Sequence, residues 1–313
     1  MKILVTGGTG FLGRSLIDFL LNHEYQISAS VRRNIESSKN IEYFNLGNIN
    51  FFTDWSSSLN GCEMIIHTAG LSHVNDDEPE SDNLIRIANI QATENLAIQA
   101  SKNKVKRFIF ISSAKVNGED SGAGYFSEDD EPNPQNLYSK SKLIAEQKLL
   151  NIAKKTGLEI IIIRPPLIYG KGSNNNLIKL IKIINRLPFF PYFSKKNSRS
   201  FLSIDNFNEL ILLCLKKELP KNSINQIYLV SDGESISSYE LLKRIKQAYE
   251  LRVILLPFPE FLSKLWIKLN YKYSFLFKFY SNFKISNSKV EKYFSWSPKS
   301  KMVNQLTKMR NDD

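Results

Sequence analysis

The chain has 313 residues, of which 42% are hydrophobic and 23% charged, a composition typical of a globular protein with one large domain or two small ones. The net charge of +11 suits an anionic partner such as nucleotide phosphates, but without zinc-finger spacing, an aromatic RNA-binding motif or a dense basic block we expect no nucleic-acid partner. The two cysteines, Cys62 and Cys214, predict neither a metal site nor a disulfide.

Short apolar runs alternate with helical stretches through the first half of the chain. The predicted strands are Lys2–Thr6, Gln26–Val31, Met64–His67, Arg107–Ser112 and Glu159–Arg164, and the predicted helices are Phe11–Asn22, Leu84–Lys102 and about 137–155. This alternation predicts an α/β fold with a doubly wound parallel (Rossmann) sheet.

After Arg164–Pro166 the pattern becomes irregular, and Gln226–Val230 is one more strand candidate. We expect a Rossmann domain of residues 1–169 plus about 200–230, and a smaller C-terminal lobe of about 170–199 and 231–313.

A glycine-rich loop, Thr6–Gly13, joins the first strand to the first helix. Gly7, Gly10 and Gly13 let the backbone turn tightly and approach a pyrophosphate at the N-terminus of the helix, which opens with Phe11 and Leu12. Because the loop lies directly between a strand and an amphipathic helix, it predicts a dinucleotide site.

Two arginines, Arg32 and Arg33, follow the second predicted strand. An acidic residue at this place usually binds the ribose 2′-hydroxyl of NAD, and none is present. Arginine offers a forked donor to a 2′-phosphate, so we favour NADP(H) as cofactor, with NAD(H) as the alternative.

Tyr138 and Lys142 form a Tyr-x-x-x-Lys pattern at the start of a predicted helix. Residues four apart lie on one helical face, and a neighbouring ammonium favours the phenolate, so we expect Lys142 to lower the pKa of Tyr138. Ser113 follows the strand Arg107–Ser112, at the sheet edge where such folds bind ligands, and can hydrogen-bond a substrate oxygen. These three residues predict hydride chemistry on an oxygen-bearing substrate.

At this point the sequence resembles the extended short-chain dehydrogenases/reductases of the NAD-dependent epimerase/dehydratase family. The resemblance covers nearly the whole chain. The matching segments are Thr6–Gly13, His67–Gly70, Asn89–Leu96, Ser112–Gly118, Tyr138–Lys142, Arg164–Gly170 and Trp296–Pro298.

The resemblance implies a role for each matching position. Ser113, Tyr138 and Lys142 would be catalytic, with Tyr138 the general acid/base and Lys142 also on the nicotinamide ribose. The C-terminal lobe would bind a UDP-sugar, and a homodimer would form through Leu84–Lys102 and 137–155. The implied cofactor contacts beyond the glycine loop are Asn48, Ala69 and Pro165, and the implied UDP-sugar contacts are Asn176, Leu177, Arg199 and Phe201.

Three positions depart from the family pattern. Asn48 stands where an Asp commonly contacts adenine, Ser139 replaces a Gly, and Asn117 replaces a common Tyr. Asn117 and the run His67–Val74 resemble a narrower branch that acts on UDP-N-acetyl-amino sugars in bacterial surface-polysaccharide (O-antigen) assembly, with UDP-N-acetylquinovosamine dehydrogenase as its example.

Several activities share the Ser-Tyr-Lys trio. We favour 4-keto reduction of a UDP-4-keto-6-deoxy-N-acetylhexosamine, because Arg32 and Arg33 suit NADPH, over a UDP-sugar 4-epimerase with tightly bound NAD. A 4,6-dehydratase typically needs an Asp-Glu pair where this chain has Ala114 and Lys115. A non-catalytic NADP-binding sensor is a remote alternative, because such proteins usually lose the Tyr or the Lys.

The stretch Leu251–Phe283 is crowded with aromatic and basic residues. We expect it to form the core of the second lobe, and peripheral association with an anionic membrane is the alternative. The apolar run Ile3–Val5 is too short for a signal peptide, and no segment approaches the roughly 18 apolar residues of a membrane span. We therefore expect a cytoplasmic protein. The residues that carry this membrane alternative are Lys264, Leu265, Trp266, Lys268, Leu269, Lys272, Phe275, Leu276, Phe277, Lys278, Phe279 and Lys284.

Overall fold

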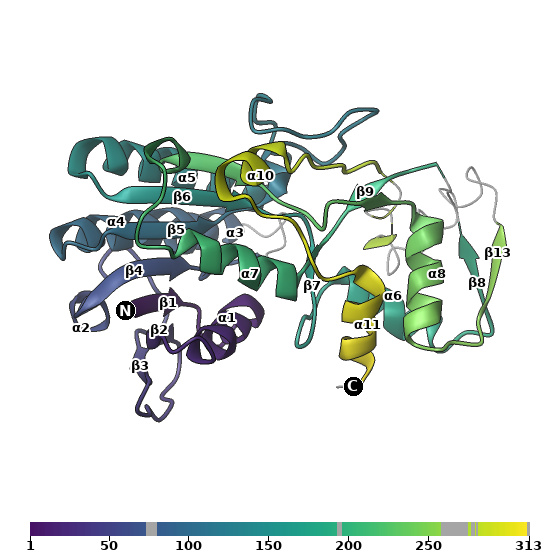
Figure 1. Ribbon diagram of the computed structural model, residues 1–313, viewed down its shortest axis with the longest axis horizontal. Helices are drawn as coiled ribbons and strands as arrows, with labels where there is room; N and C mark the ends of the chain where they lie inside the picture. Colours follow the sequence, from purple (N-terminus) through teal and green to yellow (C-terminus); the bar gives the residue numbers. More distant parts are fainter. Residues whose placement is uncertain (73–79, 193–195, 258–274, 277–278, 280, 312–313) are drawn as a thin grey trace.

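The computed structural model describes residues 1–72, 80–192, 196–257, 275–276, 279 and 281–311. Its centre is a seven-stranded sheet in the order β11-β6-β5-β4-β1-β2-β3, with every neighbouring pair parallel (Figure 1). The predicted doubly wound α/β fold is confirmed. The strands are β1 Lys2–Thr6, β2 Gln26–Val31, β3 Ile41–Asn45, β4 Cys62–His67, β5 Arg107–Ile111, β6 Glu159–Arg164 and β11 Gln226–Leu229.

Two hydrophobic clusters cover the two faces of this sheet. On one face α1 (Phe11–Leu21) and α7 (Ile204–Cys214) pack against Ile3, Val5 and Ile109. On the other face α2 (Ser56–Leu59), α4 (Ala92–Lys102) and α5 (Leu137–Thr156) pack against Leu4, Ile65 and Phe108. Successive residues of the strands point to opposite faces, so the apolar strands serve both clusters.

One predicted helix, Leu84–Lys102, differs in the structure. It consists of α3 (Ser81–Ile85), a π-helical turn η1 (Arg86–Gln91) and α4, in direct succession. A π-turn keeps the backbone helical, so the sequence pattern alone predicts one continuous helix. Such turns are frequent at functional sites.

A third cluster forms the core of a second body of elements beside the sheet (Figure 1). Its short strands pair as β10-β7, β12-β9 and β13-β8. Besides α7 and β11, the described elements after β6 are β7 Ile168–Tyr169, α6 Asn176–Ile184, β8 Phe189–Tyr192, β9 Arg199–Ser200, β10 Leu202–Ser203, η3 Lys221–Ser223, β12 Ser235–Ile236, α8 Ser238–Ala248, β13 Ile254–Pro257, α10 Ser288–Phe294 and α11 Met302–Arg310.

The assignment of chain segments to the two bodies is more interleaved than the sequence pattern suggests. Helix α10 falls in the segment expected to form the lobe, yet Val290 and Phe294 pack in the cluster on the α1 face of the large sheet. Helices α8 and α11 pack in the lobe cluster, through residues such as Leu241 and Leu306.

Three aromatic or apolar residues near the end of the stretch Leu251–Phe283 belong to the interior. Leu276 and Phe279 are buried in the lobe cluster, and Phe283 packs edge-on against Phe126. Lys284 lies over the ring of Tyr125, 4.6 Å from its centroid. Across the described residues, no helix has the length and apolar character that would let it cross a membrane. The predicted basic and aromatic residues Lys264, Leu265, Trp266, Lys268, Leu269, Lys272, Phe277 and Lys278 lie outside the described residues.

Candidate active site

The loops that carry the predicted site residues meet at one edge of the sheet. Because all seven strands are parallel, the loops that follow β1, β2, β4, β5 and β6 leave from the same, carboxyl edge. The chain winds outward in both directions from the neighbours β1 and β4, which makes this the switch point where open α/β sheets bind their ligands.

The glycine loop after β1 has a backbone that side chains would obstruct. Gly7 has a φ of +70°, and a Cβ on Gly13 would lie 2.2 Å from the Gly7 carbonyl oxygen. Helix α1 begins at Phe11 with Gly10 as its N-cap, and no described side chain caps it. The first-turn N–H groups of the helix, including those of Leu12 and Gly13, are therefore available to an anion, and the loop fits the pyrophosphate of a dinucleotide.

The other predicted cofactor residues lie on loops of the same edge. Arg32 and Arg33 follow β2, Asn48 follows β3, and all three are exposed. Ala69 follows β4, where its N–H donates to Thr6 Oγ1 at 3.1 Å. The Pro165 carbonyl follows β6 and accepts from the Ala114 N–H at 2.9 Å.

The structure brings Ser113, Tyr138 and Lys142 together. Ser113 follows β5 by two residues and hydrogen-bonds the Tyr138 side chain from the start of α5. Helix α5 begins with a capping box in which Asn136 caps the Ser139 N–H at 2.9 Å, and this fixes the first turn that carries Tyr138. One turn later, Lys142 Nζ lies 5.8 Å from the Tyr138 ring centroid.

Burial acts on the two titrating groups in opposite directions. It raises the pKa of Tyr138 to about 12, although the hydrogen bond with Ser113 lowers it. It also lowers the pKa of Lys142 to about 8, which the carboxylate of Glu146 partly offsets. The sequence predicts that Lys142 lowers the pKa of Tyr138, but in the protein alone burial raises this pKa. Lys142 Nζ donates to the Ile111 carbonyl oxygen at 2.8 Å and lies over the Phe110 ring, so it is directed toward β5.

A buried ion pair, which the sequence pattern did not predict, lies one helical turn after Lys142. Glu146, one turn after Lys142, pairs with Arg164 of β6, whose Nη2 lies 2.5 Å from Oε2. Both side chains are almost completely buried. Ser112 donates to the same carboxylate, and Arg164 Nη1 donates to Asn117 Oδ1 at 2.8 Å. The spacing Lys142-x-x-x-Glu146 on one helical face is the signal that could have indicated it.

Asn89 in the π-turn is a second residue near Lys142 that was not predicted to belong to the site. Its amide accepts from the Leu71 N–H at 2.7 Å and donates to Ser141 Oγ at 3.0 Å. A Cβ on Gly70 would lie 3.0 Å from Asn89 Oδ1 and 3.5 Å from Lys142 Nζ. The π-turn thus places a buried amide beside Lys142, and Gly70 leaves room between the β4 loop and α5.

The predicted substrate residues lie on the other body, and they differ in exposure. Asn176 is half-buried at the start of α6, whereas the Leu177 and Phe201 side chains are buried in the lobe cluster. Arg199 Nη1 donates to Ser281 Oγ at 2.6 Å, and its guanidinium lies over the Phe283 ring. Burial lowers the pKa of Arg199 to about 10, against the nearby charges of Glu119 and Asp120.

A cleft of about 450 Å³ lies between the loop after Ser113 and the segment that leads into α5. It is open, and most of its lining residues carry polar side chains, four of which are carboxylates. Glu119 on its wall pairs with Lys115 at 2.7 Å and accepts from Asn136 at 2.9 Å. The lining residues are Asn117, Gly118, Glu119, Asp120, Phe126, Asp130, Glu131, Asn133 and Gln135.

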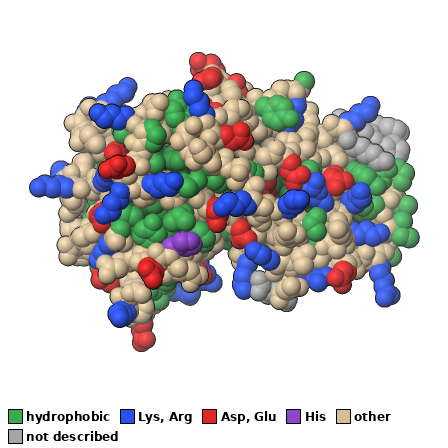
Figure 2. Space-filling view, viewed as in Figure 1, with side chains coloured by type: hydrophobic (Ala, Val, Ile, Leu, Met, Phe, Trp, Pro, Cys, Tyr) green, Lys and Arg blue, Asp and Glu red, His purple; other side chains and the backbone are tan. Residues whose placement is uncertain are grey.

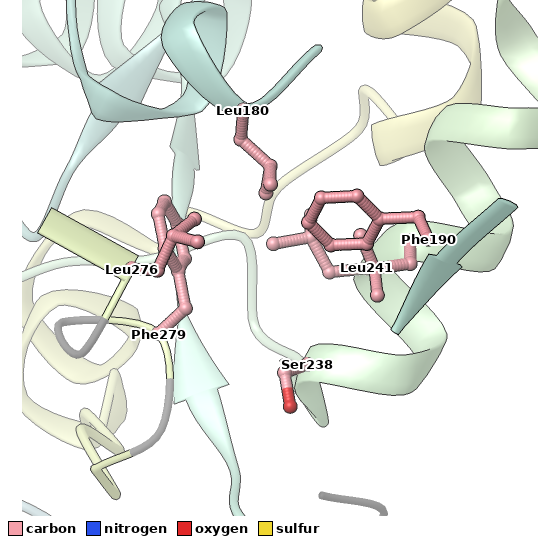
Figure 3. Close-up of a pocket in the computed structure, with 7 residues that line it drawn as sticks. Leu180, Phe190, Ser238, Leu241, Leu276 and Phe279 are labelled. Atoms are coloured by element: carbon pink, nitrogen blue, oxygen red, sulfur yellow. The ribbon is translucent and has the colours of Figure 1, made fainter. Parts of the chain in front are cut away.

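The lobe contains an apolar cavity of a different kind. Figure 3 shows Leu180, Phe190, Leu241, Leu276 and Phe279 converging from α6, β8, α8 and the segment after β13. Its volume is about 10 Å³, which holds at most one water molecule. It is therefore a packing gap in the lobe core. Among the described residues, no group of His, Cys, Asp or Glu side chains could hold a metal ion.

Comparison with known proteins identifies the family. A family model described as the NAD dependent epimerase/dehydratase family matches residues 3–229. A UDP-glucose 4-epimerase of Vibrio cholerae is 36% identical over 301 residues, which cover 95% of this chain and 90% of that protein. A decarboxylating sterol-4-alpha-carboxylate 3-dehydrogenase of Dictyostelium discoideum is 30% identical and covers 85% of this chain and 83% of its own.

Solved structures share the fold. A UDP-glucuronic acid 4-epimerase from Bacillus cereus, in complex with UDP-glucuronic acid and NAD, superposes with a TM-score of 0.80 at 20% identity, covering 100% of this chain and 98% of that one. The dinucleotide loop, the Ser-Tyr-Lys trio and the match over residues 3–229 agree with one another. The chain belongs to the NAD dependent epimerase/dehydratase family.

Proposed function

We propose that this protein is a UDP-sugar 4-epimerase that works with NAD. The observation that carries the proposal is the meeting of Ser113, Tyr138 and Lys142 beside a dinucleotide loop. The 36% identical relative, a UDP-glucose 4-epimerase over nearly its whole length, supports the same activity and replaces our first preference for 4-keto reduction. The sterol relative shows that the family admits other substrates, so the sugar itself is part of the proposal.

Each catalytic residue has a defined task in this proposal. Tyr138 takes the proton from the C4 hydroxyl of the sugar and later returns it to the same oxygen, and Ser113 hydrogen-bonds that oxygen. Lys142 is positioned to bind the ribose next to the nicotinamide. Bound NAD supplies a hydride acceptor and a positive charge, which lowers the pKa of a nearby phenol.

Inversion at C4 requires that the ketone turn over within the site before the hydride returns. We propose that residues of about 170–199 and 231–313 hold the UDP part of the substrate, with contacts from Asn176, Arg199 and the backbone of Leu177 and Phe201.

The second candidate is the 4-keto reductase with NADPH. The observation that favours it is the exposed pair Arg32 and Arg33 after β2, where no acidic residue is available for the ribose of NAD. A 4,6-dehydratase has less support, because Ala114 is buried and Lys115 pairs with Glu119 in place of an acidic pair. A sensor without turnover has less support because the Tyr138–Lys142 pair is complete.

The cysteines bear on the location of the protein, and exposed apolar side chains bear on its assembly. Cys62 and Cys214 are both free and buried, which fits a reducing compartment, and we propose that the enzyme works in the cytoplasm. We also propose a homodimer through α3, α4 and α5, where Leu84 and Ile144 are exposed apolar side chains.

One assay separates the two candidates. The purified protein is incubated with UDP-glucose, UDP-N-acetylglucosamine or UDP-glucuronic acid without added cofactor, and the sugars are separated by chromatography. The proposal predicts formation of the 4-epimer of one of them and release of NAD on denaturation. Consumption of NADPH with a UDP-4-keto sugar, without any epimer formed, would favour the reductase instead.

A further inference from the structure

The small sheet β8-β13 at the far end of the lobe has one face packed and one face open. Phe190 points inward and is buried in the lobe cluster. On the open face, Phe189 pairs in register with Ile254, and Leu256 follows two residues later. These side chains are 58%, 60% and 45% exposed, and Leu187 before β8 is 43% exposed. Leu187, Phe189, Ile254 and Leu256 are called the lobe-tip surface.

Positively charged side chains flank the residues of the lobe-tip surface along the chain. Lys182 lies in the last turn of α6, Arg186 precedes β8, and Arg252 precedes β13, and all three are exposed. Residues 176–192 and 251–257 contain no acidic residue. The nearest carboxylate along the chain, Glu250, pairs with Arg310 at 2.7 Å. Figure 2 shows hydrophobic and basic side chains side by side at this end of the molecule.

We propose that the lobe-tip surface docks on an anionic lipid bilayer. Apolar side chains that enter the headgroup region, ringed by Lys and Arg, are the combination that holds peripheral proteins on such membranes. A second copy of the chain fits less well, because a two-fold contact would oppose Arg186 and Arg252 to residues of the same charge. Four side chains also supply far less than the roughly 800 Å² per partner of a stable interface.

The position of the surface is compatible with activity on the membrane. Strands β8 and β13 lie at the end of the molecule opposite the large sheet (Figure 1). Docking there leaves the lobe between the lipid and the carboxyl edge of the large sheet, which carries Ser113 and Tyr138. The enzyme would thus work next to reactions that take place on the bilayer.

Vesicle sedimentation tests the proposal. The full-length protein is mixed at low salt with vesicles of phosphatidylglycerol and phosphatidylcholine, or of phosphatidylcholine alone. Binding to the mixed vesicles only, with at least tenfold loss at 0.5 M salt, is the expected result. The triple variant Phe189→Ser/Ile254→Ser/Leu256→Ser should lose binding at least tenfold, whereas Phe52→Ser, at a 90% exposed position elsewhere, should bind as the parent does.

Charge variants test the membrane proposal independently. Lys182→Glu/Arg186→Glu should reduce binding at least tenfold, whereas Lys39→Glu/Lys221→Glu, the same charge change at exposed positions elsewhere, should reduce it less than threefold. Absence of binding by the parent protein, or equal binding by the triple variant and the parent, would overturn the proposal. A triple variant that binds vesicles normally but has lost a dimer would assign the surface to a second copy.

Discussion

Tyr138 and Lys142 are held in surroundings that disfavour the charged form of each. Burial raises the pKa of the phenol to about 12 and lowers that of the ammonium to about 8. To carry a proton at neutral pH, Tyr138 needs a pKa well below 12, and the protein alone does not lower its pKa that far. In the proposed mechanism, the positive charge of a bound oxidised cofactor would lower this pKa, so the activity of Tyr138 would depend on cofactor binding.

Removal of the phenol tests its assigned role. Tyr138→Phe should reduce kcat by about 10²- to 10⁴-fold, the usual contribution of a general acid/base, while the protein stays folded and retains NAD. The matched control is Tyr125→Phe, because Tyr125 is an exposed phenol whose ring contacts Lys284. A turnover rate within threefold of the parent in Tyr138→Phe would remove Tyr138 from the mechanism.

The pKa of Lys142 predicts a pH-dependent stability. Its folded-state pKa of about 8 lies below the ordinary 10.5, so the folded protein binds this proton less tightly than the unfolded chain does. The stability it contributes is present above pH 10.5 and is lost as the pH falls through 8. Relative to Lys142→Met, the parent should therefore gain up to roughly 3 kcal/mol of unfolding free energy as the pH rises from 7 to 10.5.

Denaturant unfolding of both proteins at several pH values measures this difference. Tyr138 is present in both, so its own effect above pH 10 cancels between them. Curves that stay parallel from pH 7 to 10 would show that the ammonium is not depressed by burial in the folded protein.

At the scale of elements, the buried pair Glu146–Arg164 ties α5 to β6. Helix α5 carries Tyr138 and Lys142, and β6 leads to Pro165, so this pair joins the helix of the proposed catalytic residues to a proposed cofactor loop. Asn117 and Ser112 complete the hydrogen bonds of the pair. Its role is to fix the position of α5 against the sheet edge.

Glu146→Gln should destabilise the protein by about 3–5 kcal/mol, because it leaves the Arg164 guanidinium buried without a counter-charge. The control is Glu94→Gln. Glu94 of α4 forms a partly exposed pair with Lys148 of α5, and its replacement should cost about 1 kcal/mol or less. Chemical denaturation gives both values. Equal losses in the two variants would mean that burial does not distinguish the pairs.

The elements of the first half are predictable from local patterns, whereas most of the second half is not. Continuous apolar runs such as Arg107–Ile111 and Glu159–Arg164 identify central parallel strands, because both faces of the sheet are covered. The edge strand β3 is half-exposed and has no such run. The lobe strands are two to four residues long and pair across large separations, as Ile254 does with Phe189, so no local signal marks them.

In the candidate site, too, local patterns predict some features, and contacts between distant segments determine the others. Spacing on a helix and position after a strand predict Ser113, Tyr138 and Lys142. The charge state of the pair depends on burial by the folded surroundings, which a helical face alone does not reveal. The partners of Arg199, namely Ser281 and Phe283, also come from a distant segment.

For the whole molecule, the proposed homodimer makes a definite prediction. Leu84 of α3 and Ile144 of α5 are exposed although both are large and apolar. Leu84→Asp/Ile144→Asp should convert a dimer into a monomer in sedimentation equilibrium, because charged groups would be buried in the contact. The control Phe51→Asp, at another exposed apolar position, should leave the dimer intact. A monomeric parent protein would contradict the proposal.

The central claim is that the hydride removed from the sugar returns to the same sugar. The direct measurement uses a UDP-sugar with deuterium at C4, incubated with the purified protein in ordinary water and without added cofactor. Mass spectrometry and proton NMR of the product then locate the label. The proposed epimerase predicts a 4-epimer that retains deuterium at C4, because the protein holds one cofactor through the whole cycle. Loss of the label, or turnover only when NADPH is supplied, would contradict it.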